Sequence, residues 1–193
     1  MSNAARRDED LVSLIASGAV ESAFEQMVAR YAPKVHRLCL VMLREPALAE
    51  EAAQDSLLRA WRSLGSYRAA SGALSTWLYA ITRHRCLTLL SRAGPAVASF
   101  DEEEPVAAEV AQIAAPAGPD ADGAALLRNL VEQLPRAQRL AVTLYYYEER
   151  AVAEVAAMLG LPEATVKTHL HRGRQALGQR LAALGLADPA LWR

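Results

Sequence analysis

The sequence of 193 residues contains no apolar run that approaches the roughly 20 residues needed to cross a bilayer. Its N-terminus, MSNAARRDED, also lacks the apolar centre of a signal peptide. Only two cysteines are present, Cys39 and Cys86, and their spacing is not that of a metal site. We therefore expect a cytoplasmic chain without membrane insertion, whose thiols are free and buried rather than joined in a disulfide.

Aromatic residues make up only 6% of the chain, and the 52% of hydrophobic residues comes largely from alanine, which favours helix. These proportions predict an all-α fold. The familiar enzyme motifs are missing as well: there is no glycine-rich phosphate loop, no HExxH sequence and no paired Cys and His with an orienting acid. The sequence therefore predicts no catalysis and no cofactor or metal.

The net charge of −1 conceals a strong segregation of charge. Residues 93–122 contain seven acidic residues and no Lys or Arg, whereas the segments on either side each carry a small excess of basic residues. This acidic stretch is rich in Ala, Pro and Gly, which predicts a flexible linker between two domains. It could act as a plain spacer, or it could shield a basic surface while no partner is bound.

Residues 152–177, VAEVAAMLGLPEATVKTHLHRGRQAL, have the pattern of a helix-turn-helix. A short apolar helix precedes Gly160, which can adopt the left-handed conformation of a tight helix exit, and Pro162 suits the first turn of the next helix. The second helix carries a narrow apolar stripe at offsets of four, three and four. The members of this stripe are Val166, Leu170, Gly173 and Leu177.

Polar and basic side chains occupy the rest of the second helix. They can contact phosphates and the acceptors on base edges in the major groove. By itself this pattern also fits a solvated charged helix in any helical domain. The side chains concerned are Lys167, Thr168, His169, His171, Arg172 and Arg174.

Three helices with continuous apolar faces precede the linker and predict a compact bundle. The first runs from Phe24 to Met42, where Pro33 is expected to mark a bend or the join of two helices. Pro46 opens the second, and the third follows the loop Gly65–Gly72. The apolar surface expected of the second helix comes from Leu48, Ala52, Leu57, Leu58 and Trp61.

Four segments together resemble the extracytoplasmic-function group of bacterial sigma factors, in order and in spacing. The segments are FEQMVARYAPKVHRL, AEEAAQDSLLRAWRSL, LSTWLYAITRHR, and LPRAQRLAVTLYYYEE followed by the helix-turn-helix. The resemblance implies two small helical domains joined by the acidic linker. Region two would span residues 20–92 and region four residues 123–184, with an N-terminal extension containing a short helix at 1–19, the linker at 93–122 and a tail at 185–193.

The resemblance also implies a transcription initiation subunit that binds core RNA polymerase and directs it to promoters. In the family, the second helix of region two docks on the coiled coil of the polymerase clamp, and the flap is a further contact. The matching positions are Gln54, Asp55 and Arg59, with Trp61 nearby. A carboxylate and an amide beside an apolar patch can pair with polar side chains of a partner helix.

Promoter recognition is implied at two places. The minus-ten element would be read and opened by the third helix and the loop before it, with Tyr67 and Tyr79 stacking on unpaired bases. Arg83 and Arg85 would hold phosphates there, and His84 and Thr88 stand where the family often has Asn. The minus-thirty-five element would be read by the polar face of the second helix of the helix-turn-helix, from Lys167 to Arg174.

The chain departs from the family after STWLY. Positions where Arg, Lys, Asn or Asp are frequent in the family hold Ala80, Cys86, Leu87, Thr88 and Leu89. This departure leaves room for a sigma-like decoy that sequesters an anti-sigma factor without initiating transcription. A plain helix-turn-helix regulator is the other alternative, although it would not need the AEEAAQDSLLRAW surface. Family members are usually held inactive by an anti-sigma factor, and one is therefore an expected partner.

Overall fold

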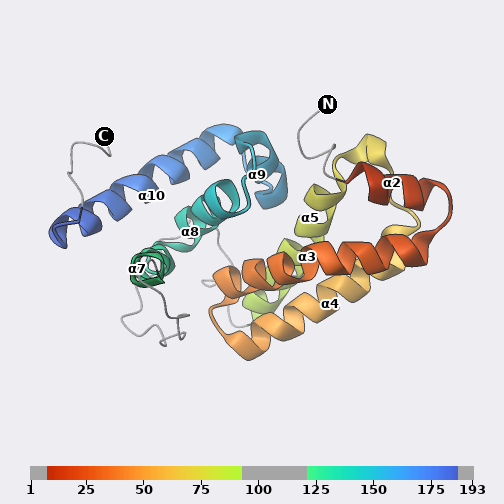
Figure 1. The fold of residues 1–193 in the computed structure, drawn as a ribbon, viewed down its shortest axis with the longest axis horizontal. Coiled ribbons are helices and arrows are strands. Elements are labelled where there is room, and N and C mark those ends of the chain that lie inside the picture. Colours follow the sequence, from red (N-terminus) through yellow and green to blue (C-terminus); the bar gives the residue numbers. More distant parts are fainter. Residues whose placement is uncertain (1–7, 93–120, 187–193) are drawn as a thin grey trace.

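The computed structural model describes residues 8–92 and 121–186, except for the side chains of residues 71, 121 and 122. Every regular element in these two stretches is helical, which confirms the all-α prediction. The expected linker lies almost wholly outside the described residues, and α7 begins at its last two positions. The helices form two groups, which we call the N-terminal domain (residues 8–92) and the C-terminal domain (residues 121–186) (Figure 1).

The N-terminal domain consists of four α-helices and one short 3-10 turn. In chain order these are α2 (Glu9–Ala16), α3 (Val20–Leu43), α4 (Pro46–Leu64), η1 (Ala69–Ser71) and α5 (Leu74–Arg92). Helix α3 packs against α2, α4 and α5, and it is therefore the centre of the domain. Helix α4 begins with Pro46 at its first position, as expected, and the Glu45 carboxylate accepts hydrogen bonds from the N–H groups of Ala47 (3.0 Å) and Leu48 (2.6 Å).

Pro33 does not join two helices: α3 is one helix from Val20 to Leu43, and the proline lies inside it. The expectation of a join is therefore wrong. One buried stripe, which includes Met27, Tyr31, Val35 and Leu38, continues on both sides of the exposed proline. Burial of this stripe outweighs the one hydrogen bond that a proline removes from a helix.

Cys39 of α3 and Cys86 of α5 are free thiols with no exposed surface, as the sequence predicted. Their sulfur atoms lie 3.6 Å apart in the contact between the two helices. Two turns before Cys39 on α3, Tyr31 donates a hydrogen bond to the buried Asp8 carboxylate (2.6 Å), which ties the start of α2 to α3. Burial, reinforced by this hydrogen bond, raises the pKa of Tyr31 to about 12.

The C-terminal domain contains four α-helices and a single π-helical segment. They are α7 (Ala121–Glu132), α8 (Arg136–Val142), the π-helical η2 (Thr143–Tyr147), α9 (Val152–Leu159) and α10 (Glu163–Ala183). Helix α10 packs along α8 and α9 and reaches α7. No helix within residues 8–92 and 121–186 is both long and apolar enough to span a membrane.

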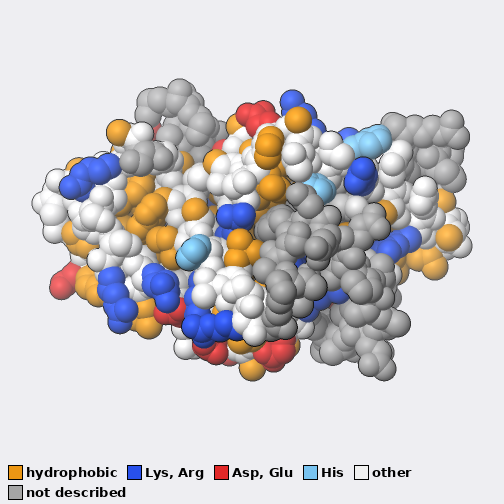
Figure 2. All heavy atoms as spheres, turned by 180° about the vertical axis from the view of Figure 1, so that it is seen from behind, with side chains coloured by type: hydrophobic (Ala, Val, Ile, Leu, Met, Phe, Trp, Pro, Cys, Tyr) orange, Lys and Arg blue, Asp and Glu red, His pale blue; other side chains and the backbone are white. Residues whose placement is uncertain are grey.

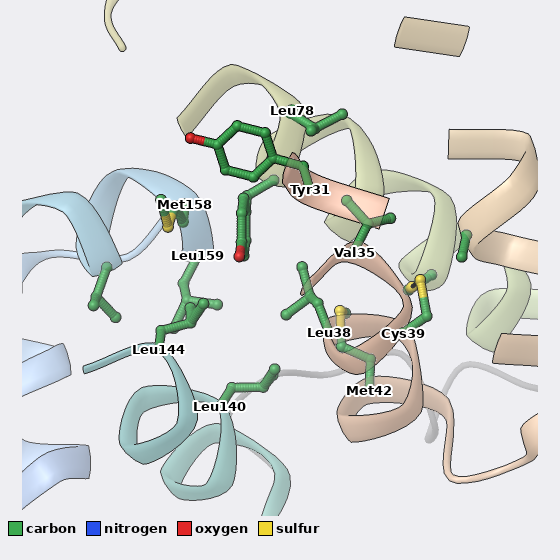
Figure 3. Close-up of a cluster of buried hydrophobic side chains, with 14 of the residues drawn as sticks. Tyr31, Val35, Leu38, Cys39, Met42, Leu78, Leu140, Leu144, Met158 and Leu159 are labelled. Atoms are coloured by element: carbon green, nitrogen blue, oxygen red, sulfur yellow. Dashed lines mark hydrogen bonds between the residues drawn. The ribbon is translucent and has the colours of Figure 1, made fainter. Parts of the chain in front are cut away.

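The two domains pack against each other through α8 on α3 and α9 on α5. A cluster of buried apolar side chains continues across this boundary: Figure 3 shows Leu38 and Met42 of α3 facing Leu140 and Leu144 of the C-terminal domain. Leu159 of α9 lies in the same cluster. The domain contact therefore has an apolar centre, as a protein interface does.

Arg139 of α8 ties the two domains together at one edge of this cluster. Its guanidinium is buried and donates hydrogen bonds to the Val41 carbonyl of α3 from Nε (3.1 Å) and Nη2 (2.9 Å). From Nη1 it also donates to the carbonyls of Glu132 (3.1 Å) and Leu134 (2.8 Å). One side chain thus satisfies carbonyl groups at the ends of two helices that belong to different domains.

Candidate functional site

Helices α9 and α10 form the predicted helix-turn-helix. Gly160 ends α9 in the left-handed conformation, with φ of 61°, and Pro162 caps the start of α10. All four stripe residues of α10 are buried. At Gly173 a Cβ atom would lie only 2.9 Å from Cγ2 of Val142, so the absence of a side chain lets α10 approach α8 closely. This approach fixes which face of α10 points outward.

The outward face of α10 carries most of the side chains predicted to read DNA. Lys167, Thr168, His171, Arg172 and Arg174 are exposed, whereas His169 is half-buried. The Thr168 hydroxyl donates a hydrogen bond to the Ala164 carbonyl (3.0 Å), so its methyl group is the part that faces outward contacts. Glu163 is the only acidic residue of α10. The helix therefore presents an exposed basic face that can lie in a major groove.

The outward face of α4 brings together the residues predicted to bind polymerase. Gln54 and Arg59 are exposed and Asp55 is half-buried. Arg59 Nε lies 3.0 Å from the Asp55 carboxylate oxygen Oδ2. The Gln54 amide donates a weaker hydrogen bond to Glu50 (3.3 Å). The polar groups needed for a partner helix are thus gathered on one side of a single helix.

Two large apolar side chains, Leu58 and Trp61, also lie on this outward face. Leu58 is 53% exposed and Trp61 is 37% exposed, with the Trp61 ring packed on Phe24 at 4.8 Å between ring centres. The sequence predicted apolar surface at both positions and placed Trp61 near the docking residues, and the structure leaves this surface partly uncovered. Leu58 follows Gln54 by four residues and Trp61 follows it by seven, a spacing that puts all three on one side of a helix.

On α5 only part of the predicted set is accessible. His84 is exposed, and Thr88 is half-buried with its hydroxyl donated to the His84 carbonyl (2.9 Å). Tyr67 is buried in the loop that precedes α5 in the sequence. Its hydroxyl donates to the Gly72 carbonyl (2.7 Å), and its ring packs on Trp77 with 5.6 Å between ring centres. With only 7% of its surface exposed, Tyr67 does not present its ring to a base in this conformation.

Arg85 is also turned inward. Its side chain is only 10% exposed and faces α4, where Nε lies 2.6 Å from Asp55 Oδ2 and Nη2 donates to Glu51 Oε1 at 3.0 Å. An arginine held in this way does not point to a phosphate on the outside of the domain. The structure thus links one of the residues predicted to contact DNA with one of those predicted to bind polymerase.

Two further α5 residues are covered by the C-terminal domain. Tyr79 is 1% exposed, and the Arg150 guanidinium lies 5.6 Å from the centre of its ring. Burial raises the pKa of Tyr79. The Arg83 guanidinium lies against the helix-turn-helix corner, with Nη1 3.1 Å from the position that a Cβ atom on Gly160 would occupy. Burial lowers the pKa of Arg83.

The segment between η2 and α9 holds this contact in place, and the sequence reasoning did not single it out. Glu148 is buried and pairs with Lys34 (3.4 Å) and Arg37 (3.0 Å) of α3. Arg150 is buried as well and donates to the Ser75 hydroxyl of α5 (3.1 Å). Glu148 and Arg150 thus each bind a different helix of the N-terminal domain. Lys34, Arg37 and Ser75 lie more than 70 residues away in the chain, so the local sequence, which shows only the pairing of Arg150 with Glu154 (3.8 Å), does not mark this contact.

The surface view in Figure 2 shows Lys, Arg and His side chains on both domains. They are scattered among apolar and uncharged groups rather than gathered in one patch. In the part of the chain that the structure describes, no three His, Cys, Asp or Glu side chains are grouped as metal ligands. The features that stand out are therefore the exposed faces of α4 and α10 and the covered face of α5.

Two family models match the chain at these places. The model for sigma-70 region 2 matches residues 27–95, and the model for sigma-70 region 4 matches residues 124–177. The first match contains α4 and α5 with the docking face. The second contains the whole helix-turn-helix pattern, to Leu177 at the end of its apolar stripe.

Curated relatives match almost the whole chain. The ECF RNA polymerase sigma factor SigM of Mycobacterium tuberculosis (strain H37Rv) is 33% identical over 180 residues, which cover 93% of this chain and 87% of that protein. The ECF RNA polymerase sigma factor SigW of Bacillus subtilis (strain 168) is 31% identical over 174 residues, which cover 85% and 91% of the two chains.

Solved structures share the fold. One is the structure of CnrH in complex with the cytosolic domain of CnrY, with a TM-score of 0.62 and 22% identity over 91% of this chain and 97% of that one. Another is the sigma factor RpoE in complex with the anti-sigma factor NepR from Bartonella quintana, with a TM-score of 0.66 and 23% identity over 82% and 96%. The extent of the curated matches decides the family: the chain belongs to the ECF RNA polymerase sigma factors, the subunits that direct transcription initiation.

Proposed function

We propose that the exposed face of α4 binds core RNA polymerase, while α10 and α5 read the two promoter elements. One observation carries the first part of this proposal. Gln54, Asp55 and Arg59 share a face with Leu58 and Trp61, which are large apolar side chains left uncovered by the rest of the protein. Apolar anchors ringed by polar groups are typical of the centre of a protein interface.

The partner for this face is the coiled coil of the polymerase clamp, with the flap as a further contact of the C-terminal domain. A helix of the clamp that presents Arg and Gln side chains would pair with Asp55 and Gln54 and cover Trp61. The exposed indole and the Leu58 side chain would supply the apolar part of the binding free energy. Catalysis would then belong to the polymerase, and this chain would supply position and specificity in the cytoplasm.

For promoter reading, the exposed basic face of α10 would enter the major groove of the minus-thirty-five element. Its Lys and Arg side chains would hold phosphates or base acceptors. Helix α5 would read the minus-ten element with His84 and Arg83. Because the C-terminal domain covers Tyr79 and Arg83, the two domains must separate before α5 can reach DNA. Binding to polymerase would supply this separation.

We further propose that an anti-sigma factor controls the chain, since related folds were solved in complex with CnrY and with the anti-sigma factor NepR. Such a partner would act by covering the α4 face or by keeping the two domains in contact. In the closed chain the α4 face is exposed but α5 is covered, so a partner that keeps the domains in contact would withhold α5 from DNA, and one that covers α4 would withhold the docking face.

Reconstituted transcription tests the proposal, with purified bacterial core RNA polymerase and a library of promoter fragments. The wild-type chain should yield specific transcripts, whereas Gln54→Arg should lose them together with core binding because it places a positive charge on the docking face. Gln26→Arg is the matched control, since Gln26 is an exposed glutamine on the adjacent helix α3. Circular dichroism confirms that both variants fold.

The other outcomes separate the alternatives. Core binding without any transcript would favour the decoy, and binding to DNA without binding to core would favour a plain transcriptional regulator. If Gln54→Arg and Gln26→Arg bound core equally well, the α4 face would not be the docking surface.

A further inference from the structure

Arg85 occupies a place that neither of the two proposed surfaces explains. It lies on α5, the helix that we propose reads DNA, yet its side chain crosses to α4, the helix that we propose binds polymerase. Its Nε lies 2.6 Å from Asp55 Oδ2, and Nη2 donates to Glu51 Oε1 at 3.0 Å. With only 10% of the side chain exposed, this guanidinium is committed to the contact between the helices.

The Asp55 carboxylate is held from two sides by this arrangement. Arg85 approaches Oδ2 from α5, and Arg59 approaches the same oxygen from the next turn of α4, at 3.0 Å. The two guanidinium groups differ in environment: the Arg59 side chain is 52% exposed, whereas the Arg85 side chain is nearly covered. A covered charge is screened less by water and salt than an exposed one, so the ion pair with Arg85 persists at salt concentrations that weaken the pair with Arg59.

Fixing one oxygen of Asp55 leaves the other available. The Asp55 side chain retains 29% of its surface, on the same face as Gln54 and Leu58. A carboxylate whose rotamer is already set loses less conformational freedom when a partner binds.

We propose that Arg85 is a positioning residue for polymerase binding, which holds the Asp55 carboxylate in the orientation that the core enzyme meets. The proposal rests on the assignment of the α4 face as the docking surface. Arg85 thereby joins the two surfaces of the N-terminal domain: α5 fixes, from behind, the polar group that α4 offers to polymerase. This role replaces the phosphate contact that the sequence suggested for Arg85.

A double-mutant cycle on core binding tests the proposal, using the full-length chain and purified core RNA polymerase. Arg85→Gln should weaken core binding about threefold to tenfold, because Asp55 then keeps only its contact with the exposed Arg59 and is held from one side. In a chain that already carries Asp55→Asn, the same Arg85→Gln change should alter the affinity less than twofold. Such non-additivity shows that Arg85 acts through Asp55. A general loss of stability would instead weaken binding equally in both backgrounds.

Two further variants sharpen the cycle. Arg85→Lys keeps the charge but cannot reach Asp55 and Glu51 with two nitrogen atoms, and it should restore part of the affinity lost in Arg85→Gln. Arg92→Gln is the matched control, because Arg92 is an exposed arginine on the same helix. It should leave core binding unchanged.

The salt dependence of DNA binding tests the alternative role of Arg85, which is a contact with a DNA phosphate. With preformed holoenzyme and duplex DNA of random sequence, loss of one phosphate contact should reduce the slope of log K against log salt by about 0.9. Arg85→Gln should leave this slope unchanged. A reduced slope with undiminished core affinity would overturn the proposal in favour of a phosphate contact.

Additive losses in the cycle would also overturn the proposal, and so would tighter core binding by Arg85→Gln. Failure of the docking assignment gives a different pattern, in which Gln54→Arg and Asp55→Asn both leave core affinity unchanged. If Gln54→Arg weakens core binding while Arg85→Gln does not, the docking surface stands and only the role of Arg85 falls.

Discussion

The two helices predicted to read DNA differ in how the protein presents them. On α10 the reading side chains lie on an exposed face, from Lys167 to Arg174. On α5, Tyr79 and Arg85 are buried and Arg83 lies against Gly160 of the other domain. In this closed arrangement one reader is ready to bind, whereas the other becomes available only after a change of conformation. We therefore expect the free chain and the chain in the polymerase complex to differ in what DNA they can recognise.

The most disruptive change to this comparison is Glu148→Arg. It places a third positive charge beside Lys34 and Arg37 in a buried position, so the domains should lose about 3–5 kcal/mol of contact free energy and separate. Small-angle X-ray scattering should show a larger radius of gyration. Adding Arg37→Glu should restore compactness by re-forming an ion pair of reversed sign.

Glu149→Arg serves as the control, since the same change is made at the exposed neighbouring position. A radius that stays unchanged in Glu148→Arg would mean that the apolar cluster alone holds the domains together. Helix α10 would then stay exposed and helix α5 covered, as in the parent chain.

A smaller effect is expected at alkaline pH, where the buried hydroxyl group of Tyr31 makes the free energy of unfolding depend on pH. The pKa of Tyr31 is raised to about 12, so the folded chain keeps this proton after the unfolded chain has lost it near pH 10. The stabilisation is complete below pH 10 and is lost as the pH rises toward 12, by up to about 2–3 kcal/mol.

Urea unfolding at several pH values measures this loss. Tyr31→Phe should flatten the decline between pH 10 and 12, whereas Tyr146→Phe, at a tyrosine that is 49% exposed, should leave it as it is. Equal slopes in the parent chain and in Tyr31→Phe would contradict the burial of this hydroxyl group.

The smallest expected effect is on the salt dependence of DNA binding by the free chain, and it distinguishes α10 from α5. Binding to random-sequence duplex DNA should lose about 0.9 in salt slope with Lys167→Gln, because this side chain is exposed and can reach a phosphate. Arg83→Gln should change little, because the C-terminal domain covers this side chain. Combined with Glu148→Arg, the Arg83 substitution should begin to lower the slope. Equal effects of the two single substitutions would show that the free chain is already open.

The sequence allowed the helix-turn-helix to be placed almost to the residue. Gly160 and the stripe through Gly173 are local signals, and α10 packs along only one stripe. Helix α5 is different, because it is covered by α3 and α4 on one side and by α9 on another. Polar residues such as Ser75 and Thr82 are buried there, and no periodicity in the sequence separates its faces.

The other gaps in the sequence prediction have a similar cause. The sequence predicts apolar surface at Leu58 and Trp61 but does not indicate whether another element covers it, and in the structure these side chains stay partly exposed. Glu148 and Arg150 read as ordinary loop charges, and their burial depends on contacts with a domain on the far side of the linker. Tertiary contacts between distant segments are what the pattern of residues leaves undetermined.

The apolar cluster that crosses the domain boundary, with Leu38, Leu140, Leu144 and Leu159, gives the closed chain a thermal signature. Exposure of apolar surface raises the heat capacity, so opening the domains should carry a positive heat-capacity change. The hydrophobic part of the contact weakens on cooling, while the ion pairs of Glu148 remain. The equilibrium between closed and open chains should therefore shift toward the open form in the cold, and the chain would be least restrained at low temperature.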